Sequence, residues 1–233
     1  MAKTDDKAKT AAAAKAKGEA QRAKAKAAKE SAGFKVAEEV DAGPAPEPRL
    51  YKHYREKVVP ELKTSLKIDN LLAVPRLEKI VISMGLGKAM VAGEKAKMDT
   101  AEKELAIIAG QKPVRCKAKR SVANFKVREG METGLKVTLR GVRMYEFLDR
   151  MITLAFPRVK DFRGVSANGF DKQGNYNFGF TEQTVFPEIA GADVNFQQGM
   201  NVTMVTTGKN ANQARELLKQ FGFPFKTDEK VKD

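Results

Sequence analysis

The sequence predicts an α+β protein whose sheet is covered by helices on one side and open on the other. Segments that alternate between apolar and polar residues, as half-buried strands do, are separated by segments with the apolar spacing of helices. The two clearest alternating segments have one apolar side and one polar, partly cationic side. That pattern is typical of a sheet with one solvated face.

The first half of the folded region is predicted as helix, strand, helix and strand in turn. Apolar residues recur at helical spacing over 51–66, where Pro60 predicts a kink. Residues 75–84 alternate as a strand does and are followed by glycines. A second helix is expected over 94–108, because its apolar residues share one stripe, and a glycine stops it. A short strand is expected over 114–117.

The second half adds two strands and two helices. Residues 134–140 alternate strictly, and residues 143–156 form an apolar helix that ends at a proline. Residues 201–207 alternate again as a strand. A final helix begins at an asparagine cap, either Asn210 or Asn212, and glycine and proline stop it.

The composition predicts a partner of negative charge. The 233-residue chain holds 43 Lys and Arg against 29 Asp and Glu, a net charge of +14. Such an excess most often faces nucleic acid and less often an anionic membrane. We expect no membrane span or secretory signal, because no long apolar run exists. The single cysteine, Cys116, cannot form an internal disulfide, which fits a reducing compartment, and the cytoplasm is the expected location.

Residues 1–49 differ in composition from the rest of the chain. They are rich in alanine and lysine, have no apolar stripe that could dock a helix, and close with three prolines. We expect a flexible extension, disordered or transiently helical, that either only solubilises the chain or also touches RNA. Residues 50–233 are expected to form a single α+β domain.

The polar side of the two clearest strands carries cations and a hydroxyl. Lys79 lies on the first of these strands, and Lys136, Thr138 and Arg140 lie on the second. A rigid face with these groups would suit an RNA backbone. The alternative is an ordinary solvated sheet face, and the pattern alone leaves both open.

The strongest basic segment runs from Lys112 to Arg128, with seven basic residues and no acidic one. It lies between two predicted strands, and such long loops are uncommon unless they have a function. Its cations can neutralise phosphates, and Phe125 can stack on a base or ribose. The alternative is a solvated hairpin with Phe125 folded back into the core.

Residues 158–181 mix glycine, asparagine and aromatic residues, as loops and short strands do. Their first part carries a weaker basic patch of Arg158, Lys160 and Arg163, which Asp161 interrupts. This patch predicts either RNA contact or simple surface charge.

Signals for catalysis are poor. His53 is the only histidine, and a zinc site would need several cysteine or histidine ligands. Residues 85–89, GLGKA, lack the glycine spacing and the Ser or Thr of a nucleotide-binding phosphate loop. We therefore expect no enzyme, no cofactor and no metal.

Several ordered segments match a known family. They are VPRLEKIVISMGLGKA (74–89), IAGQKPV (108–114), AKRSVANFKVREG (118–130), KVTLRGVRMYEFLDR (136–150), PRVKDFRGVS (157–166), GNYNFGFTEQTVFPEI (174–189) and FGFPF (221–225). On these segments the chain from about residue 50 to residue 226 resembles the bacterial type of large-subunit ribosomal protein five. The resemblance implies a mostly antiparallel sheet with helices on one side, and a role in attaching 5S rRNA in the central protuberance.

The resemblance also implies a 5S rRNA site, whose matching positions are Lys79, Ser83, Gln111 and Thr138. We add Lys136 and Arg140 from the same strand face. Ser83 stands where the family usually has an asparagine, and a serine keeps a hydroxyl but loses the reach of the amide.

In the family, the basic loop reaches the elbow of the tRNA in the P site. The matching residues are Lys117, Lys119, Arg120, Ser121, Phe125, Lys126 and Arg128. Glu132 replaces a proline usual after this loop, so the resemblance implies a less rigid stem. Gln173 replaces an arginine and removes one phosphate contact.

The resemblance implies further partners. These are the large-subunit rRNA, with Arg158, Lys160 and Arg163 as candidate contacts, neighbouring 5S-associated ribosomal proteins, and the small-subunit head protein thirteen across an intersubunit bridge, which we expect within residues 158–182. No membrane partner is expected. The alternative function is a general nucleic-acid-binding or condensing protein driven by the Lys/Ala extension.

Overall fold

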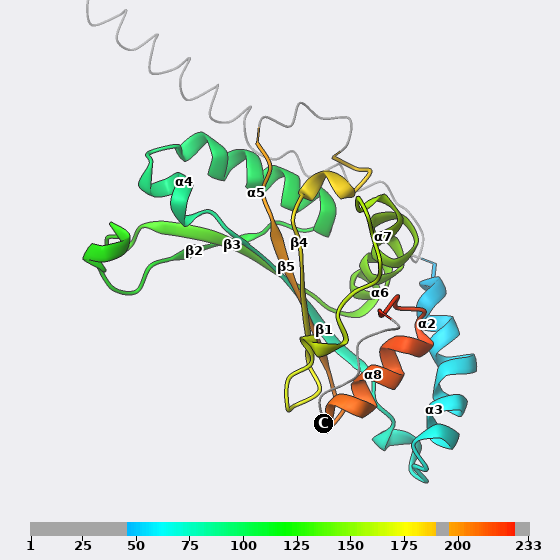
Figure 1. Ribbon diagram of the computed structural model, residues 1–233. Coiled ribbons are helices and arrows are strands. Elements are labelled where there is room, and N and C mark those ends of the chain that lie inside the picture. The colour runs from blue at the N-terminus through cyan, green and yellow to red at the C-terminus, as the bar shows by residue number, and fades with distance from the viewer. Residues whose placement is uncertain (1–45, 190–195, 227–233) are drawn as a thin grey trace, which may run out of the picture. The chain divides into compact units, whose positions relative to one another are not determined.

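Five strands form one sheet in a computed structural model that describes residues 46–189 and 196–226 (Figure 1). The strand order is β2-β3-β1-β5-β4, and every neighbouring pair is antiparallel. The strands are β1 (Leu77–Gly85), β2 (Val114–Lys117), β3 (Glu132–Leu139), β4 (Tyr176–Phe180) and β5 (Met200–Thr206). The predicted α+β class with a mostly antiparallel sheet is confirmed. The extension predicted over 1–49 lies almost wholly outside the described residues.

The helices lie close to the predicted positions. They are α2 (Arg49–His53), α3 (Val59–Ser65), α4 (Gly87–Val91), α5 (Lys95–Ala109), α6 (Gly141–Arg150), α7 (Phe156–Arg158) and α8 (Ala211–Gln220). The short helix α4 was not predicted. Asn210 occupies the cap position of α8, but its side chain makes no capping hydrogen bond.

Each of two helical regions contains a π-helical turn next to a proline. Tyr54–Val58 joins α2 to α3 before Pro60, and Met151–Ala155 joins α6 to α7 before Pro157. A proline has no N–H for the preceding turn, and its ring crowds the carbonyl four residues earlier. The wider turn relieves this conflict, so the kink expected at Pro60 takes the form of a π turn.

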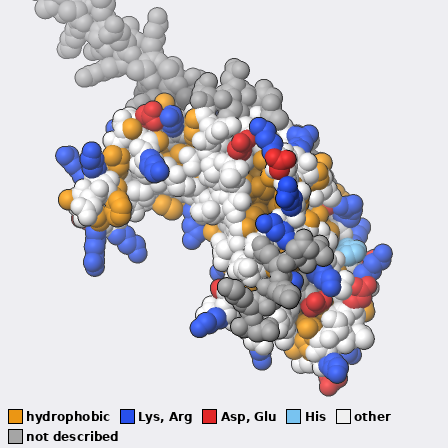
Figure 2. Space-filling model, viewed as in Figure 1, with side chains coloured by type: hydrophobic (Ala, Val, Ile, Leu, Met, Phe, Trp, Pro, Cys, Tyr) orange, Lys and Arg blue, Asp and Glu red, His pale blue; other side chains and the backbone are white. Residues whose placement is uncertain are grey.

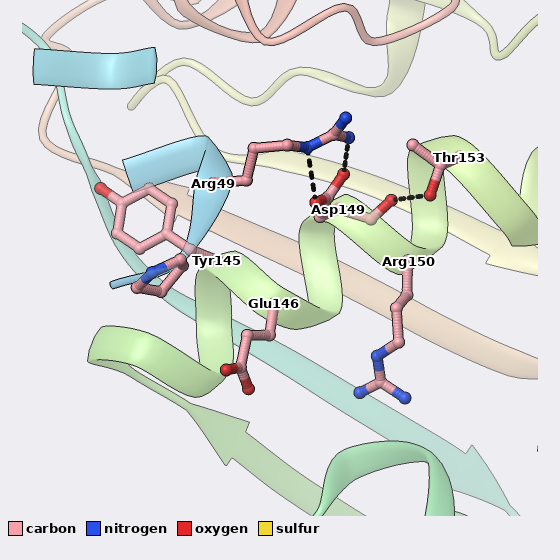
Figure 3. Close-up of a pocket in the computed structure, with 7 residues that line it drawn as sticks. Arg49, Tyr145, Glu146, Asp149, Arg150 and Thr153 are labelled. Atoms are coloured by element: carbon pink, nitrogen blue, oxygen red, sulfur yellow. Dashed lines mark hydrogen bonds and ion pairs between the residues drawn. The ribbon is translucent and has the colours of Figure 1, made fainter. Parts of the chain in front are cut away.

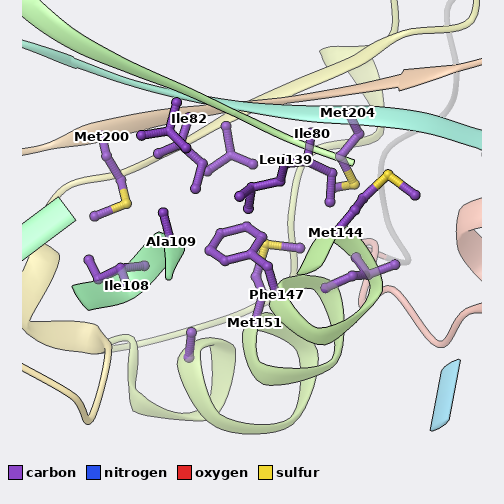
Figure 4. Packing of buried hydrophobic residues seen from close by; sticks show 14 of the residues in the cluster. Ile80, Ile82, Ile108, Ala109, Leu139, Met144, Phe147, Met151, Met200 and Met204 are labelled. Atoms are coloured by element: carbon purple, nitrogen blue, oxygen red, sulfur yellow. The ribbon is translucent and has the colours of Figure 1, made fainter. Parts of the chain in front are cut away.

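Apolar side chains of the central strands point to the helical side of the sheet. Ile80 and Ile82 of β1 and Leu139 of β3 are buried there, and Figure 4 shows them facing Phe147 and Met151 of the helical layer. Each such side chain stabilises the fold by about 1.5–3 kcal/mol. Burial of this face sets the strand register, because a slip of one residue would turn the apolar set toward solvent.

The opposite side of the sheet is open within the described residues. Alternate residues of β1, β3 and β5 are partly or fully exposed there, in contrast to their buried neighbours. The predicted one-sided sheet is therefore confirmed. We call this side the open face and define it by Lys79, Val81, Ser83, Lys136, Thr138, Asn177, Asn201 and Thr203.

A buried polar cluster holds the start of β5. The Gln183 amide donates to Oε2 of Glu104 at 3.2 Å and to the Phe196 carbonyl at 2.8 Å. The Gln198 amide donates to the Gly85 carbonyl at 3.0 Å. Burial raises the pKa of the Glu104 carboxyl, and the hydrogen bond from Gln183 partly offsets that effect. These bonds tie the segment before β5 to α5 and to the end of β1.

Two glycines face each other where β1 and β3 part. Gly85 and Gly134 are Cα partners, but their surroundings differ. A Cβ on Gly134 would lie 2.5 Å from the Met84 carbonyl oxygen, whereas a Cβ on Gly85 would meet nothing within 4 Å. The close approach of the strands therefore depends on Gly134 alone.

We predict that Gly134→Ala lowers the free energy of unfolding by about 1–3 kcal/mol, because a backbone carbonyl cannot move aside without separating the strands. The matched change Gly85→Ala should alter it by less than about 1 kcal/mol. Denaturant unfolding of both variants measures the difference. Equal effects would contradict the close approach at Gly134.

Candidate nucleic-acid interface

Polar side chains of the open face form rows across the strands. Ser83 of β1 is the Cα partner of Lys136 on β3 and of Asn201 on β5. In the next row, Val81 is the partner of Thr138 and of Thr203. Side chains so paired lie about 5 Å apart at Cβ. The face therefore presents cations, hydroxyls and amides at regular spacing.

The structure brings the four positions of the implied 5S rRNA site to one region. Lys79, Ser83 and Thr138 share the open face. Gln111 follows α5 in sequence, and its amide donates to the Thr138 carbonyl at 2.9 Å. Arg143 approaches the Gln111 amide oxygen at 3.5 Å. The contact between Gln111 and Thr138 joins elements that periodicity alone does not connect.

Glu78 lies beside two cations of this region. Its carboxylate is 3.8 Å from the Lys79 ammonium and 3.6 Å from the Arg140 guanidinium. Exposed ion pairs of this kind contribute about 0–1 kcal/mol, so a phosphate can displace the carboxylate. Lys136 is exposed and forms no ion pair with any described residue.

Residues 118–131 form an ordered loop between β2 and β3. Val122 and Val127 exchange backbone hydrogen bonds of 2.9 and 3.2 Å, and the Ser121 hydroxyl accepts one from the Glu129 amide at 2.9 Å. Ser121 therefore has a clear structural role in the loop. The exposed cations of the loop and its β2 end are Lys117, Lys119, Arg120, Lys126 and Arg128. Figure 2 shows lysine and arginine side chains gathered at the left end of the view, where this loop lies in Figure 1.

Phe125 stands out from the loop with 74% of its surface exposed. The alternative in which this ring folds into the core is therefore wrong. The ring forms one wall of a hollow that is otherwise lined by Gly87, Lys88, Val91 and Val127, where α4 meets the loop. The loop thus presents an aromatic surface surrounded by cations.

Arg115 is turned toward the helical side and is bound by carboxylates. Its guanidinium donates to Glu102 and to Asp99 (2.7 Å), both on α5, and to Glu132 on β3 at 3.1 Å. The hydrogen bond to Glu102, followed by that to Asp99, raises the pKa of Arg115. One of the seven predicted cations is thus internally paired. Glu132 belongs to this cluster, and its ion pair with Arg115 joins β3 to β2 at the base of the loop. The resemblance had implied a less rigid stem at this position.

The second basic patch lies apart from the open face. Arg158 ends α7, and Lys160 and Arg163 follow it; all three side chains are exposed. They make no ion pair with any residue in the described ranges. The patch therefore keeps its charge but does not join the rows of β1, β3 and β5.

A hollow beside α2 has no arrangement suited to catalysis. Arg49 forms two hydrogen bonds with the Asp149 carboxylate, of 3.1 and 2.5 Å, and clamps α2 to α6 (Figure 3). Burial raises the pKa of Tyr145, in the same wall, to about 12. The described residues contain no group of three or more metal-ligating side chains and no helix able to cross a membrane.

Three polar residues of the open face were not predicted from the sequence: Asn177 on β4, and Asn201 and Thr203 on β5. Asn201 and Thr203 alternate with buried residues along β5, as Ser83 and Val81 do along β1. The alternation over 201–207 was the available signal. Their place beside β1 could not be known without the strand order.

The open face and the exposed loop form a surface for a polyanion, because both present cations together with groups that can contact bases or sugars. The fold and this surface define the class of protein as a basic nucleic-acid-binding protein.

Comparison with known proteins identifies the family. Residues 70–128 match the model of ribosomal protein L5, and residues 132–225 match the model of the C-terminus of the same ribosomal family. The chain is 54% identical over 177 residues to the large ribosomal subunit protein uL5 of Thermosipho africanus, covering 76% of this chain and 97% of that protein. It is 52% identical over 179 residues to uL5 of Francisella tularensis subsp. mediasiatica, covering 77% and 99%.

The chain belongs to the ribosomal protein L5 family. It is a structural constituent of the large ribosomal subunit and not an enzyme. RNA binding and a role in translation follow from the family. Its place is the ribosome, which in bacteria is cytoplasmic.

Proposed function

We propose that the open face binds 5S rRNA and helps to attach it to the large subunit. The main support for this proposal is that residues from three separate segments of the chain lie in one region. They are Lys79, Ser83, Gln111 and Thr138. Lys136 and Arg140 add charge beside them. Cations release counterions when they neutralise phosphates, and the hydroxyls and amide can orient the RNA.

The hydrogen bond to the Thr138 backbone carbonyl holds the Gln111 side chain in place beside β3 before RNA binds. The Gln111 amide uses one hydrogen for the Thr138 carbonyl, which leaves a second hydrogen to donate. The Thr138 hydroxyl has no hydrogen-bond partner within the described residues, although its side chain is half-buried. A polar group held in place before binding loses less conformational entropy when it binds.

We further propose that the basic loop contacts tRNA in the P site. Its internal hydrogen bonds hold Phe125 outward, so the ring is available for stacking, which contributes about 1–3 kcal/mol per base. Lys119, Arg120, Lys126 and Arg128 would neutralise nearby phosphates. The order of the loop supports this role, because a flexible loop would lose more entropy on binding.

We propose further contacts at the second basic patch and at the loops that follow it. The exposed charge of Arg158, Lys160 and Arg163 supports contact with large-subunit rRNA. Residues 158–182 would meet the small-subunit head protein thirteen, and other 5S-associated proteins would lie nearby. We also propose that residues 50–233 act as a single domain whose RNA binding does not require the extension.

Binding to 5S rRNA and to an unrelated RNA of equal length tests the proposal. We expect the chain to prefer 5S rRNA. Its affinity for 5S rRNA should fall by about 10³- to 10⁵-fold between 50 and 200 mM salt, if about 6–10 phosphates are neutralised. A chain that lacks residues 1–46 should keep this selectivity. Equal binding of both RNAs would contradict the proposal. If removal of residues 1–46 abolishes RNA binding, the alternative function of a general nucleic-acid-condensing protein is favoured.

Thr138→Ala should weaken 5S rRNA binding by about 1 kcal/mol or more, because an RNA group would lose its hydrogen-bond partner. The control Thr64→Ala, on an exposed part of α3, should leave binding unchanged. The double change Lys119→Ala/Arg120→Ala should weaken tRNA binding and leave 5S rRNA binding nearly intact. If the Thr138 and loop variants reduce 5S rRNA binding equally, the division of the surface is wrong.

A further inference from the structure

The open face continues beyond β1 onto β5. Asn201 and Thr203 lie on the same side of the sheet as Ser83 and Val81, their Cα partners. Asn201 is exposed and Thr203 is partly exposed, so no described element covers this part of the sheet. The polar surface is therefore wider than the implied 5S rRNA site of Lys79, Ser83, Gln111 and Thr138.

Asn201 completes a row of three different polar groups. Lys136 on β3, Ser83 on β1 and Asn201 on β5 follow one another across adjacent strands. Neighbouring strands lie about 4.8 Å apart, so the two ends of this row are separated by about 10 Å. Lysine and asparagine are both long enough to reach a ligand above the short serine. The row therefore offers a cation, a hydroxyl and an amide to one ligand.

The side-chain amide of Asn201 is available for a ligand. It takes part in no hydrogen bond with any residue of the described ranges, whereas the Thr203 hydroxyl donates to the Asn177 amide oxygen at 2.6 Å. The Asn201 amide oxygen lies 3.1 Å from the place where a Cβ on Gly179 would stand. The missing side chain at Gly179 thus leaves the space that the Asn201 amide occupies.

The backbone on both sides of Asn201 is firmly held. The Gln198 amide binds the Gly85 carbonyl just before β5 begins, and β5 then pairs with β1 on one side and β4 on the other. Pairing at both edges of β5 fixes the backbone of Asn201 and the direction of its Cα–Cβ bond. Because the backbone is already ordered, binding of a ligand to the amide costs only side-chain entropy.

We propose that Asn201 is an RNA-contacting residue, and that its amide acts with Ser83 and Lys136 on one phosphate–ribose unit. This inference rests on the proposed binding of RNA to the open face. A side-chain amide can donate two hydrogen bonds and accept two, so it can bind a phosphate oxygen or a 2′-hydroxyl. Lys136 supplies the charge, and Ser83 supplies a hydroxyl between them.

Asn201→Ala should weaken 5S rRNA binding by the full-length chain about fivefold, the effect expected for one hydrogen bond. The slope of log affinity against log salt should stay unchanged, because the amide carries no charge. Asn212→Ala, an exposed asparagine on α8, is the matched control and should bind as the unaltered chain does. Asn201→Asp, of equal size, should weaken binding more, because its carboxylate repels phosphate.

The change Ser83→Asn places an amide one strand away and tests whether the row acts as a unit. We expect Ser83→Asn to restore most of the affinity lost in Asn201→Ala and to add little to the unaltered chain, a non-additive result. If Asn201→Ala and Asn201→Asp bind 5S rRNA normally while Thr138→Ala does not, the inference is wrong and the proposed function stands. If the unaltered chain does not prefer 5S rRNA, the proposed function itself fails.

Discussion

The burial of one side of a single antiparallel sheet is the constraint on which the rest of the structure depends. Helices α5 and α6 cover the apolar side, where Ile80, Val137 and Val202 lie in the core. Since side chains alternate along a strand, this packing turns every other residue of β1, β3 and β5 outward. The same interaction that stabilises the fold therefore displays the polar rows, and a change in register would destroy both.

The loop depends on a second, electrostatic arrangement at its base. Arg115 points to the helical side and joins β2 to α5 and β3 through three carboxylates. Above this cluster, the exposed cations of the loop have no acidic neighbour except Glu129 within residues 118–131. One basic segment thus serves two purposes, because its inward cation holds the stem and its outward cations remain free for phosphate.

Local periodicity predicted most elements but none of the pairing between them. The alternation around Lys79 and Thr138 was enough to predict a shared polar face, because a strand with one apolar side has only one other side. The contact of Gln111 with Thr138 and the row that includes Asn201 depend on strand order, which is a long-range property. Similarly, α4 was missed because a five-residue helix carries too little periodic signal.

The most direct test of RNA binding at the open face is chemical acetylation of lysines in the full-length chain. Mass spectrometry would measure the acetylation rate of each lysine with and without 5S rRNA. Lys79 and Lys136 lie on the open face, whereas Lys103 on α5 and Lys219 on α8 are exposed on the helical layer. We predict that 5S rRNA slows acetylation of Lys79 and Lys136 and leaves the acetylation rates of Lys103 and Lys219 unchanged. Protection of the helical lysines, with Lys79 and Lys136 still reactive, would contradict RNA binding at the open face.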